Sequence, residues 1–181
     1  MTSPAVPPLL DDAQFAALVA GTGLDELRLA AIVREVRDYC GWHIAPAIDE
    51  TLTVDGSGGR VQHLPTLLLN SVASVTENGT ELAADAYEWS ADGSLRRCGY
   101  WYWTRRYRGV VAVVNHGYAA VPPNIVSVIL DAASAAISTP VGETAEQPET
   151  MGPFTFGGRG GVVLTTAQRR VLDRYALPGR P

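Results

Sequence analysis

The first absence in this 181-residue sequence is lysine, because all 14 basic side chains are arginine. Without lysine there is no Schiff-base nucleophile and no P-loop lysine, which excludes two large classes of enzyme site. A lysine-rich nucleic-acid-binding tail is excluded for the same reason. Charge of either sign is also scarce, since charged residues make up 18% of the chain against about 25% in an average domain. This low share favours a surface that neighbouring molecules partly cover.

Long apolar runs are missing as well. No stretch approaches the ~18 residues of a membrane span, and Met1-Thr2-Ser3-Pro4 lacks the basic and apolar regions of a signal peptide. We therefore expect synthesis in the cytosol. The two cysteines, Cys40 and Cys98, form no CxxC motif and are interpreted as small apolar residues rather than a disulfide. Apolar residues still make up 46% of the chain, enough for one domain with an arm.

The helical periodicity is confined to the two ends of the chain. Residues 1–9 hold three prolines and predict an extended N-terminal segment. Apolar residues then recur at i, i+3 and i+4 spacing. Asp11 is a candidate N-cap, Gly21 is a candidate stop for the first helix, and Gly41 is a candidate stop for the second. Thr165 or Thr166 would cap the last helix. The pattern predicts helices at about residues 11–20, 24–40 and 123–138, and a short fourth helix at about 165–175.

Between the helices, β-branched runs and turn residues predict an antiparallel β-module of five to seven strands over about residues 50–116. A glycine-rich turn predicts that residues 51–54 and 60–64 form a hairpin. Asn78-Gly79 is typical of a type I′ turn. Residues 87–90 and 94–97 predict a further hairpin, and 109–115 is the clearest strand.

Beyond the third helix, residues 141–161 are rich in glycine, proline and glutamate and have no regular period, which predicts a linker or arm. Residues 162–164 are compatible with a short strand. The predicted fold is therefore α+β: a small helical bundle with an inserted antiparallel β-module and a C-terminal extended arm that ends in a short helix. The predicted boundaries are an extended segment at 1–9, a core at 10–140 and the arm at 141–181.

No catalytic constellation is evident. His43, His63 and His116 are far apart in sequence and fit no metal-ligand spacing, so we interpret them as separate structural residues, with a composite metal site as the alternative. There is no GxSxG motif, and Cys98 lies near arginines but lacks a neighbouring base. We predict no catalytic residue, no metal and no cofactor.

The segment with the densest chemistry is Gly99-Tyr100-Trp101-Tyr102-Trp103-Thr104-Arg105-Arg106-Tyr107-Arg108. Trp, Tyr and Arg are favoured at protein–protein hot spots, which points to a protein interface. The alternatives are an aromatic β-hairpin that packs within the chain and a single-stranded nucleic-acid-binding module that uses residues 101–108. Apolar groups in the arm should also dock on a partner. The predicted interface residues are Trp101, Trp103, Arg105, Arg106, Tyr107, Phe154, Phe156, Arg169, Leu172 and Tyr175.

Several phrases resemble the head-to-tail connector, or adaptor, proteins of long-tailed double-stranded DNA phages. One is Tyr39-Cys40-Gly41-Trp42-His43-Ile44-Ala45-Pro46 after the opening helices. Others are Leu64-Pro65-Thr66 before Ser71-Val72-Ala73-Ser74-Val75-Thr76, Tyr87-Glu88-Trp89-Ser90 with Gly93, and Val113-Val114-Asn115-His116-Gly117-Tyr118 with Val121-Pro122-Pro123. The resemblance covers about residues 10–140 and leaves out the arm.

The resemblance implies a structural virion protein without catalysis or cofactor. Such subunits form a ring, expected to be dodecameric, below the portal protein, where it joins the DNA-filled head to the tail and extends the DNA channel. The implied partners are further copies of the chain, the portal protein, the next neck protein, and genomic double-stranded DNA that passes without specific binding; no membrane is involved. The implied location is the virion neck. The alternative is another neck or tail component, such as a stopper or tail terminator. The arm would then reach a neighbouring subunit or the portal.

Overall fold

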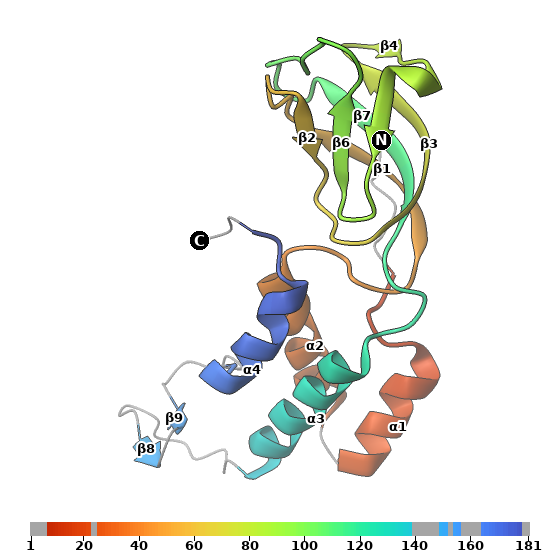
Figure 1. The fold of residues 1–181 in the computed structure, drawn as a ribbon. Helices are drawn as coiled ribbons and strands as arrows, with labels where there is room; N and C mark the ends of the chain where they lie inside the picture. The colour runs from red at the N-terminus through yellow and green to blue at the C-terminus, as the bar shows by residue number, and fades with distance from the viewer. Residues whose placement is uncertain (1–6, 23–24, 139–148, 152–153, 157–163, 179–181) are drawn as a thin grey trace. The chain divides into compact units, whose positions relative to one another are not determined.

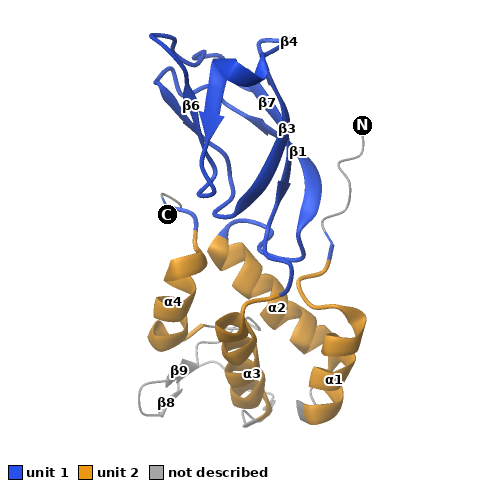
Figure 2. Cartoon of the chain, turned by 45° about the vertical axis from the view of Figure 1, so that its right-hand side comes forward, with its two compact units in different colours: residues 1–7, 41–120, 177–181 blue, residues 8–40, 121–176 orange. Residues whose placement is uncertain are grey.

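A computed structural model describes residues 7–22, 25–138, 149–151, 154–156 and 164–178. The chain divides into two compact units (Figure 2). The β unit is built on Gly41–Ala120, with residues 1–7 and 177–181 assigned to it, and the helical unit consists of Pro8–Cys40 and Val121–Ala176. Within the described residues, four helices and antiparallel sheets make the fold α+β, as predicted.

The helical unit contains α1 (Asp12–Thr22), α2 (Glu26–Cys40), α3 (Pro123–Ser138) and α4 (Thr166–Leu172), which a 3-10 turn, η2 (Asp173–Tyr175), extends (Figure 1). α2 packs against α3, and α4 packs on both of these helices. The buried side chains of α2 follow the predicted stripe, and these are Leu29, Ile32, Val36 and Cys40. Among the described residues, no helix has the length and hydropathy that crossing a membrane requires.

Local capping signals account for the helix ends. Asp11 accepts a hydrogen bond from the backbone N–H of Gln14 over 2.6 Å, and the side chain of Gln14 accepts one from the backbone N–H of Asp11. Thr165 and Gln168 form the same reciprocal capping box at α4. Gly41, directly after α2, has φ +78°, the left-handed conformation that ends a helix. These contacts confirm Asp11 and Thr165 as caps and Gly41 as a stop, whereas Gly21, the predicted stop of the first helix, lies inside α1.

The β unit contains seven strands in two sheets. The four-stranded sheet has the order β1-β7-β3-β4, and the three-stranded sheet has the order β2-β6-β5. The bounds are β1 Ile48–Val54, β2 Val61–His63, β3 Leu69–Glu77, β4 Thr80–Glu81, β5 Tyr87–Trp89, β6 Ser94–Arg97 and β7 Val110–His116, with a 3-10 turn, η1, at Ala84–Ala86.

Two of the three predicted hairpins are present. β3 and β4 turn at Asn78 and Gly79, whose φ values of +53° and +86° suit a type I′ turn, and β5 pairs with β6. The hairpin predicted from residues 51–54 and 60–64 is wrong, because β1 pairs with β7 whereas β2 pairs with β6. The backbone of the turn between them bonds to the loop that contains Thr104 and Arg106, and the two strands join different sheets.

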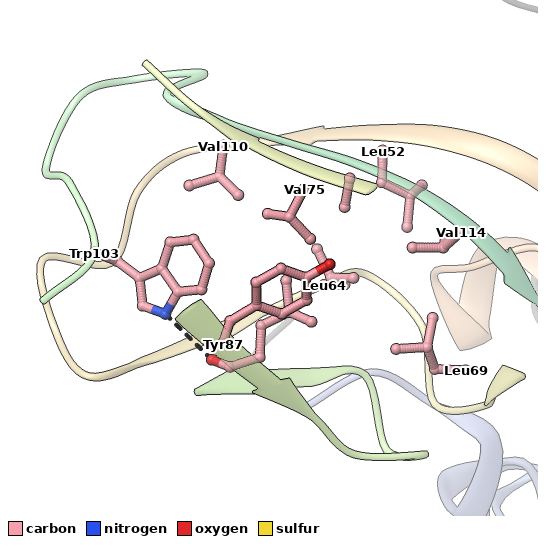
Figure 3. Packing of buried hydrophobic residues seen from close by; sticks show 10 residues of the cluster. Leu52, Leu64, Leu69, Val75, Tyr87, Trp103, Val110 and Val114 are labelled. Atoms are coloured by element: carbon pink, nitrogen blue, oxygen red, sulfur yellow. Dashed lines mark hydrogen bonds between the residues drawn. The ribbon is translucent and has the colours of Figure 1, made fainter. Parts of the chain in front are cut away.

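The core of the β unit lies between its two sheets (Figure 3). β7 alternates buried and more exposed side chains, as a strand with one covered face does. The buried cluster draws on both sheets and on one loop, and it consists of Leu52, Leu64, Leu69, Val75, Tyr87, Leu95, Trp103, Val110, Ala112 and Val114.

The C-terminal region adds a two-stranded sheet of β8 (Glu149–Met151) and β9 (Phe154–Phe156). The rest of the predicted arm up to residue 163 lies outside the described residues, as do residues 1–6 of the predicted N-terminal segment. Of the strand predicted at 162–164, only Leu164 is described, and it is not in a strand.

Candidate interface

Two loops meet at one end of the β unit, and together they form what we call the tip: the turn of residues 55–60 and the loop of residues 99–108. The backbone N–H of Gly56 donates to the carbonyl of Arg106 over 2.9 Å. A Cβ atom at position 56 would lie 2.1 Å from the carbonyl oxygen of Thr104, so the two loops can approach this closely only with glycine there. Hydrogen bonds between the two loops therefore fix the backbone of the tip.

Trp103 anchors the longer loop in the core (Figure 3). Its side chain is 2% exposed, and its Nε1 donates to the carbonyl of Leu95 over 3.2 Å. The guanidinium of Arg97 lies 5.3 Å from the centre of the indole ring and pairs with Glu77 over 3.2 Å. Glu77 also accepts the backbone N–H of Thr104 over 2.6 Å. One carboxylate thus ties the loop to the ends of β3 and β6.

The anchored loop presents a platform of large aromatic side chains to solvent. Their exposed fractions are far above those of core aromatics, at 95% for Tyr100, 71% for Trp101, 64% for Tyr102 and 87% for Tyr107. Exposed aromatic groups gathered in one segment are typical of a binding surface. The tip also carries four exposed arginines that form no ion pair with a described carboxylate, and these are Arg60, Arg105, Arg106 and Arg108.

The structure sorts the predicted interface residues of this segment into two groups. Trp101, Arg105, Arg106 and Tyr107 are exposed on the tip, where a partner could reach them. Trp103 is buried, so its prediction as an interface residue is corrected: it packs within the chain, the alternative that the sequence left open. The segment is a loop rather than the β-hairpin expected for that alternative, because its backbone bonds to the turn of residues 55–60.

The predicted interface residues near the C-terminus lie in the helical unit rather than on the tip. Leu172 is fully buried where α4 packs on α2 and α3, which corrects its prediction as an interface residue. Arg169 is exposed, and the hydroxyl of Tyr175 accepts a hydrogen bond from Asn124 at 3.5 Å. Phe154 and Phe156 belong to β9, and their side chains lie outside the described part of the structure.

Two of the three histidines converge, which the spacing in the sequence did not predict. The rings of His43 and His116 lie 5.0 Å apart, and Nε2 of His116 lies 3.0 Å from a carboxylate oxygen of Glu50. His63 is separate and shares a hydrogen bond with Ser94. Among the described residues, no group of three or more His, Cys, Asp or Glu side chains is arranged to hold a metal ion.

The cysteines are both free thiols. Burial, and secondarily the negative charge of Asp173, raises the pKa of the Cys40 thiol to about 12, so it is protonated and unreactive at neutral pH. Cys98 is partly buried at the end of β6, where its backbone N–H donates to the carbonyl of Ala86.

Sequence reasoning missed the residues that hold the tip in place. Glu77 and Arg97 come from different strands and meet Thr104 only in the folded β unit. Nothing in their spacing indicates the contact, since it depends on how the two sheets stack. The glycine-rich turn of residues 55–60 was visible, but as a hairpin turn rather than as the support of a second loop.

Comparison with known proteins gives a match in structure only. No family model and no curated protein matches the sequence. Among solved structures, a chain from the neck of a native gene transfer agent (GTA) particle computed with C12 symmetry is 18% identical, with a TM-score of 0.58 and all of both chains covered.

Two further chains give the same result. One, from the neck of an empty GTA particle computed with C6 symmetry, is 19% identical with a TM-score of 0.56, and 99% of this chain and 98% of that one are covered. The other, from the virion of a native gene transfer agent particle, is 18% identical with a TM-score of 0.55 and the same coverage. At this level of identity the comparisons establish a shared fold over essentially the whole chain.

Proposed function

We propose that this chain is a structural subunit of the neck of a phage-like particle, where copies of it form a ring. The observation that carries the proposal is the end-to-end structural match to a chain from a particle neck computed with C12 symmetry. The match includes both the helical and the β unit, so it does not depend on one common motif. The resemblance in sequence to head-to-tail connector proteins supports the same role independently.

In this role the ring has twelve copies and lies below the portal protein. It joins the DNA-filled head to the tail and extends the channel through which double-stranded DNA passes without specific binding. The next neck protein binds its other side. The chain works in the virion and carries out no chemical step, so its function rests on surfaces rather than on a catalytic pocket.

The surfaces of the chain suit such an assembly. A closed ring uses heterologous contacts, in which two different faces of each subunit meet. The tip offers four arginines and four exposed aromatic side chains on an anchored backbone. Trp, Tyr and Arg dominate the binding energy of protein interfaces, which supports a docking role for the tip.

The competing assignment is another neck or tail component, such as a stopper or tail terminator. The same structural match supports the connector assignment more strongly, because it includes the four helices of the described residues along with the sheets. A mainly β component would leave the helical unit unmatched.

The deciding experiment is a measurement of mass by multi-angle light scattering, for the purified chain alone and after mixing with the portal protein of the same particle. A ring-sized species, or one bound copy per portal subunit, is the expected result. A chain that neither forms a ring nor binds the portal would overturn the proposal.

A further inference from the structure

The β unit carries opposite charge on its two sides. On one side, the tip combines Arg60, Arg105, Arg106 and Arg108 with a single acid, Asp55, so its formal charge is +3. Asp55 accepts a hydrogen bond from the backbone N–H of Arg108 over 2.6 Å, so it belongs to the tip's own structure. Because the whole chain carries −5, the rest of the chain carries −8.

Four of the eight acids of the β unit lie in residues 81–92, a segment that contains no basic residue and that we call the acidic edge. Four carboxylates lie here, all on exposed residues, and these are Glu81, Asp85, Glu88 and Asp92. Glu88 pairs with Arg96 on the neighbouring strand, and Asp92 accepts the backbone N–H of Ser94 over 2.9 Å. Glu81 and Asp85 form no ion pair with any described residue.

The tip and the acidic edge lie at different edges of the two sheets. The turn of residues 55–60 links β1 to β2, each the first strand in the order of its sheet. The acidic edge runs through β4 and β5, the last strands of the same two sheets. Figure 1 shows β2 and β4 on different sides of the β unit. The two surfaces approach each other where the backbone N–H of Cys98, next to the tip, donates to the carbonyl of Ala86 in the acidic edge. Within the described residues, no ion pair joins an arginine of the tip to a carboxylate of the acidic edge.

We propose that the tip of one copy docks on the acidic edge of the next copy, an inference that rests on the proposed ring. A ring needs two complementary surfaces on different sides of one subunit, which is the arrangement that the charges of the β unit provide. The unpaired arginines Arg105 and Arg106 meet the unpaired carboxylates of Glu81 and Asp85. Trp101 and the neighbouring tyrosines cover apolar groups of the acidic edge, where Trp89 is 45% exposed.

The anchor explains how the tip can act as a preformed surface. Because Trp103 and Glu77 hold the loop within the β unit, docking immobilises few backbone degrees of freedom. A binding surface that is already ordered loses less entropy on association than a loop that orders when it binds.

The contact is tested by reversing the charges of the tip alone, of the acidic edge alone, and of both surfaces together. Arg105→Glu/Arg106→Glu should raise the midpoint concentration of self-association at least about tenfold, and Glu81→Arg/Asp85→Arg should do the same, because like charges then face each other. A chain carrying all four substitutions should associate again to within about threefold of the parent. The matched control, Arg28→Glu/Arg34→Glu, makes the same charge change on exposed residues of α2 and should leave the midpoint unchanged.

The readout is sedimentation equilibrium, with circular dichroism to verify that each variant is folded. If association is restored in the fourfold variant, a second copy is the molecule that binds the tip. Only a second copy carries the compensating substitutions, whereas a different partner would keep its original charges. Unchanged association in both single-surface variants, or no recovery in the fourfold variant, overturns the inference and leaves the proposed ring standing.

Two other outcomes also decide against the inference. A parent chain that stays monomeric at its highest soluble concentration yet binds the portal overturns the tip contact but not the neck function. Oligonucleotide binding by the parent that Arg105→Glu/Arg106→Glu abolishes, with self-association unchanged, would assign the tip to single-stranded nucleic acid.

Discussion

The buried ion pair between Glu77 and Arg97 predicts a large effect of a small substitution. In Glu77→Gln the side chain keeps its shape and can still accept the backbone N–H of Thr104, but Arg97 loses its counter-charge. Both side chains are 11% exposed, so water can replace the lost carboxylate only in part. Removing one partner of a fully buried pair costs about 3–5 kcal/mol. Allowing for the remaining exposure and the retained hydrogen bond, we expect a loss of about 2–3 kcal/mol.

The assay is urea unfolding of the β unit, followed by tryptophan fluorescence. With a denaturant slope of about 1–3 kcal/mol per molar, the expected loss lowers the midpoint by about 0.7–3 M. The matched control is Glu88→Gln, which breaks the pair that Glu88 on β5 forms with Arg96 on the neighbouring strand β6. Those side chains are 61% and 60% exposed, so we expect a loss below about 1 kcal/mol. Equal losses of stability in the two variants would refute the argument that burial makes the Glu77–Arg97 pair contribute more to the free energy of unfolding.

Three further predictions concern other parts of the chain. Gly56→Ala places its Cβ against the carbonyl oxygen of Thr104 and should destabilise the chain by about 1–3 kcal/mol. Gly21→Ala has open space beside it in α1 and should stabilise the chain by about 0.5–1 kcal/mol. Thermal unfolding of the two variants compares these effects. Leu172→Ala should cost about 2–5 kcal/mol of stability, measured by helical circular dichroism in urea, and a neutral result would mean that α4 does not pack in the helical unit. Because the pKa of Cys40 is raised, the folded chain holds the thiol proton more tightly than the unfolded chain does. The free energy of unfolding should therefore fall by about 1.4 kcal/mol per pH unit as the pH rises from about 9 toward 12. Cys40→Ala should flatten that slope.

The parts of the fold that depend on neighbours in sequence could be predicted from the sequence. Helix caps, the apolar stripe of α2 and the type I′ turn at Asn78 each rest on a few adjacent residues, and all are present. β7 was also evident, because a β-branched run with a covered face forms a strand in most contexts.

Strand pairing could not be predicted in the same way. The turn of residues 55–60 has the composition of a hairpin turn, yet Gly56 donates to Arg106 from a loop fifty residues later. That bond forms only after β6 and β7 are placed, so the choice between a local hairpin and two separate sheets depends on packing across the whole β unit.

Trp101 and Trp103 show the same limit within the tip itself. They are two residues apart in one loop, yet one is 71% exposed and the other 2%. No strand or helix period applies to a loop, so nothing in the sequence distinguishes them. What distinguishes them is the pair of Glu77 and Arg97, which fixes the loop so that one indole enters the core. The core position of Trp103 is therefore the reason that the aromatic groups beside it stay on the surface, where a partner can use them.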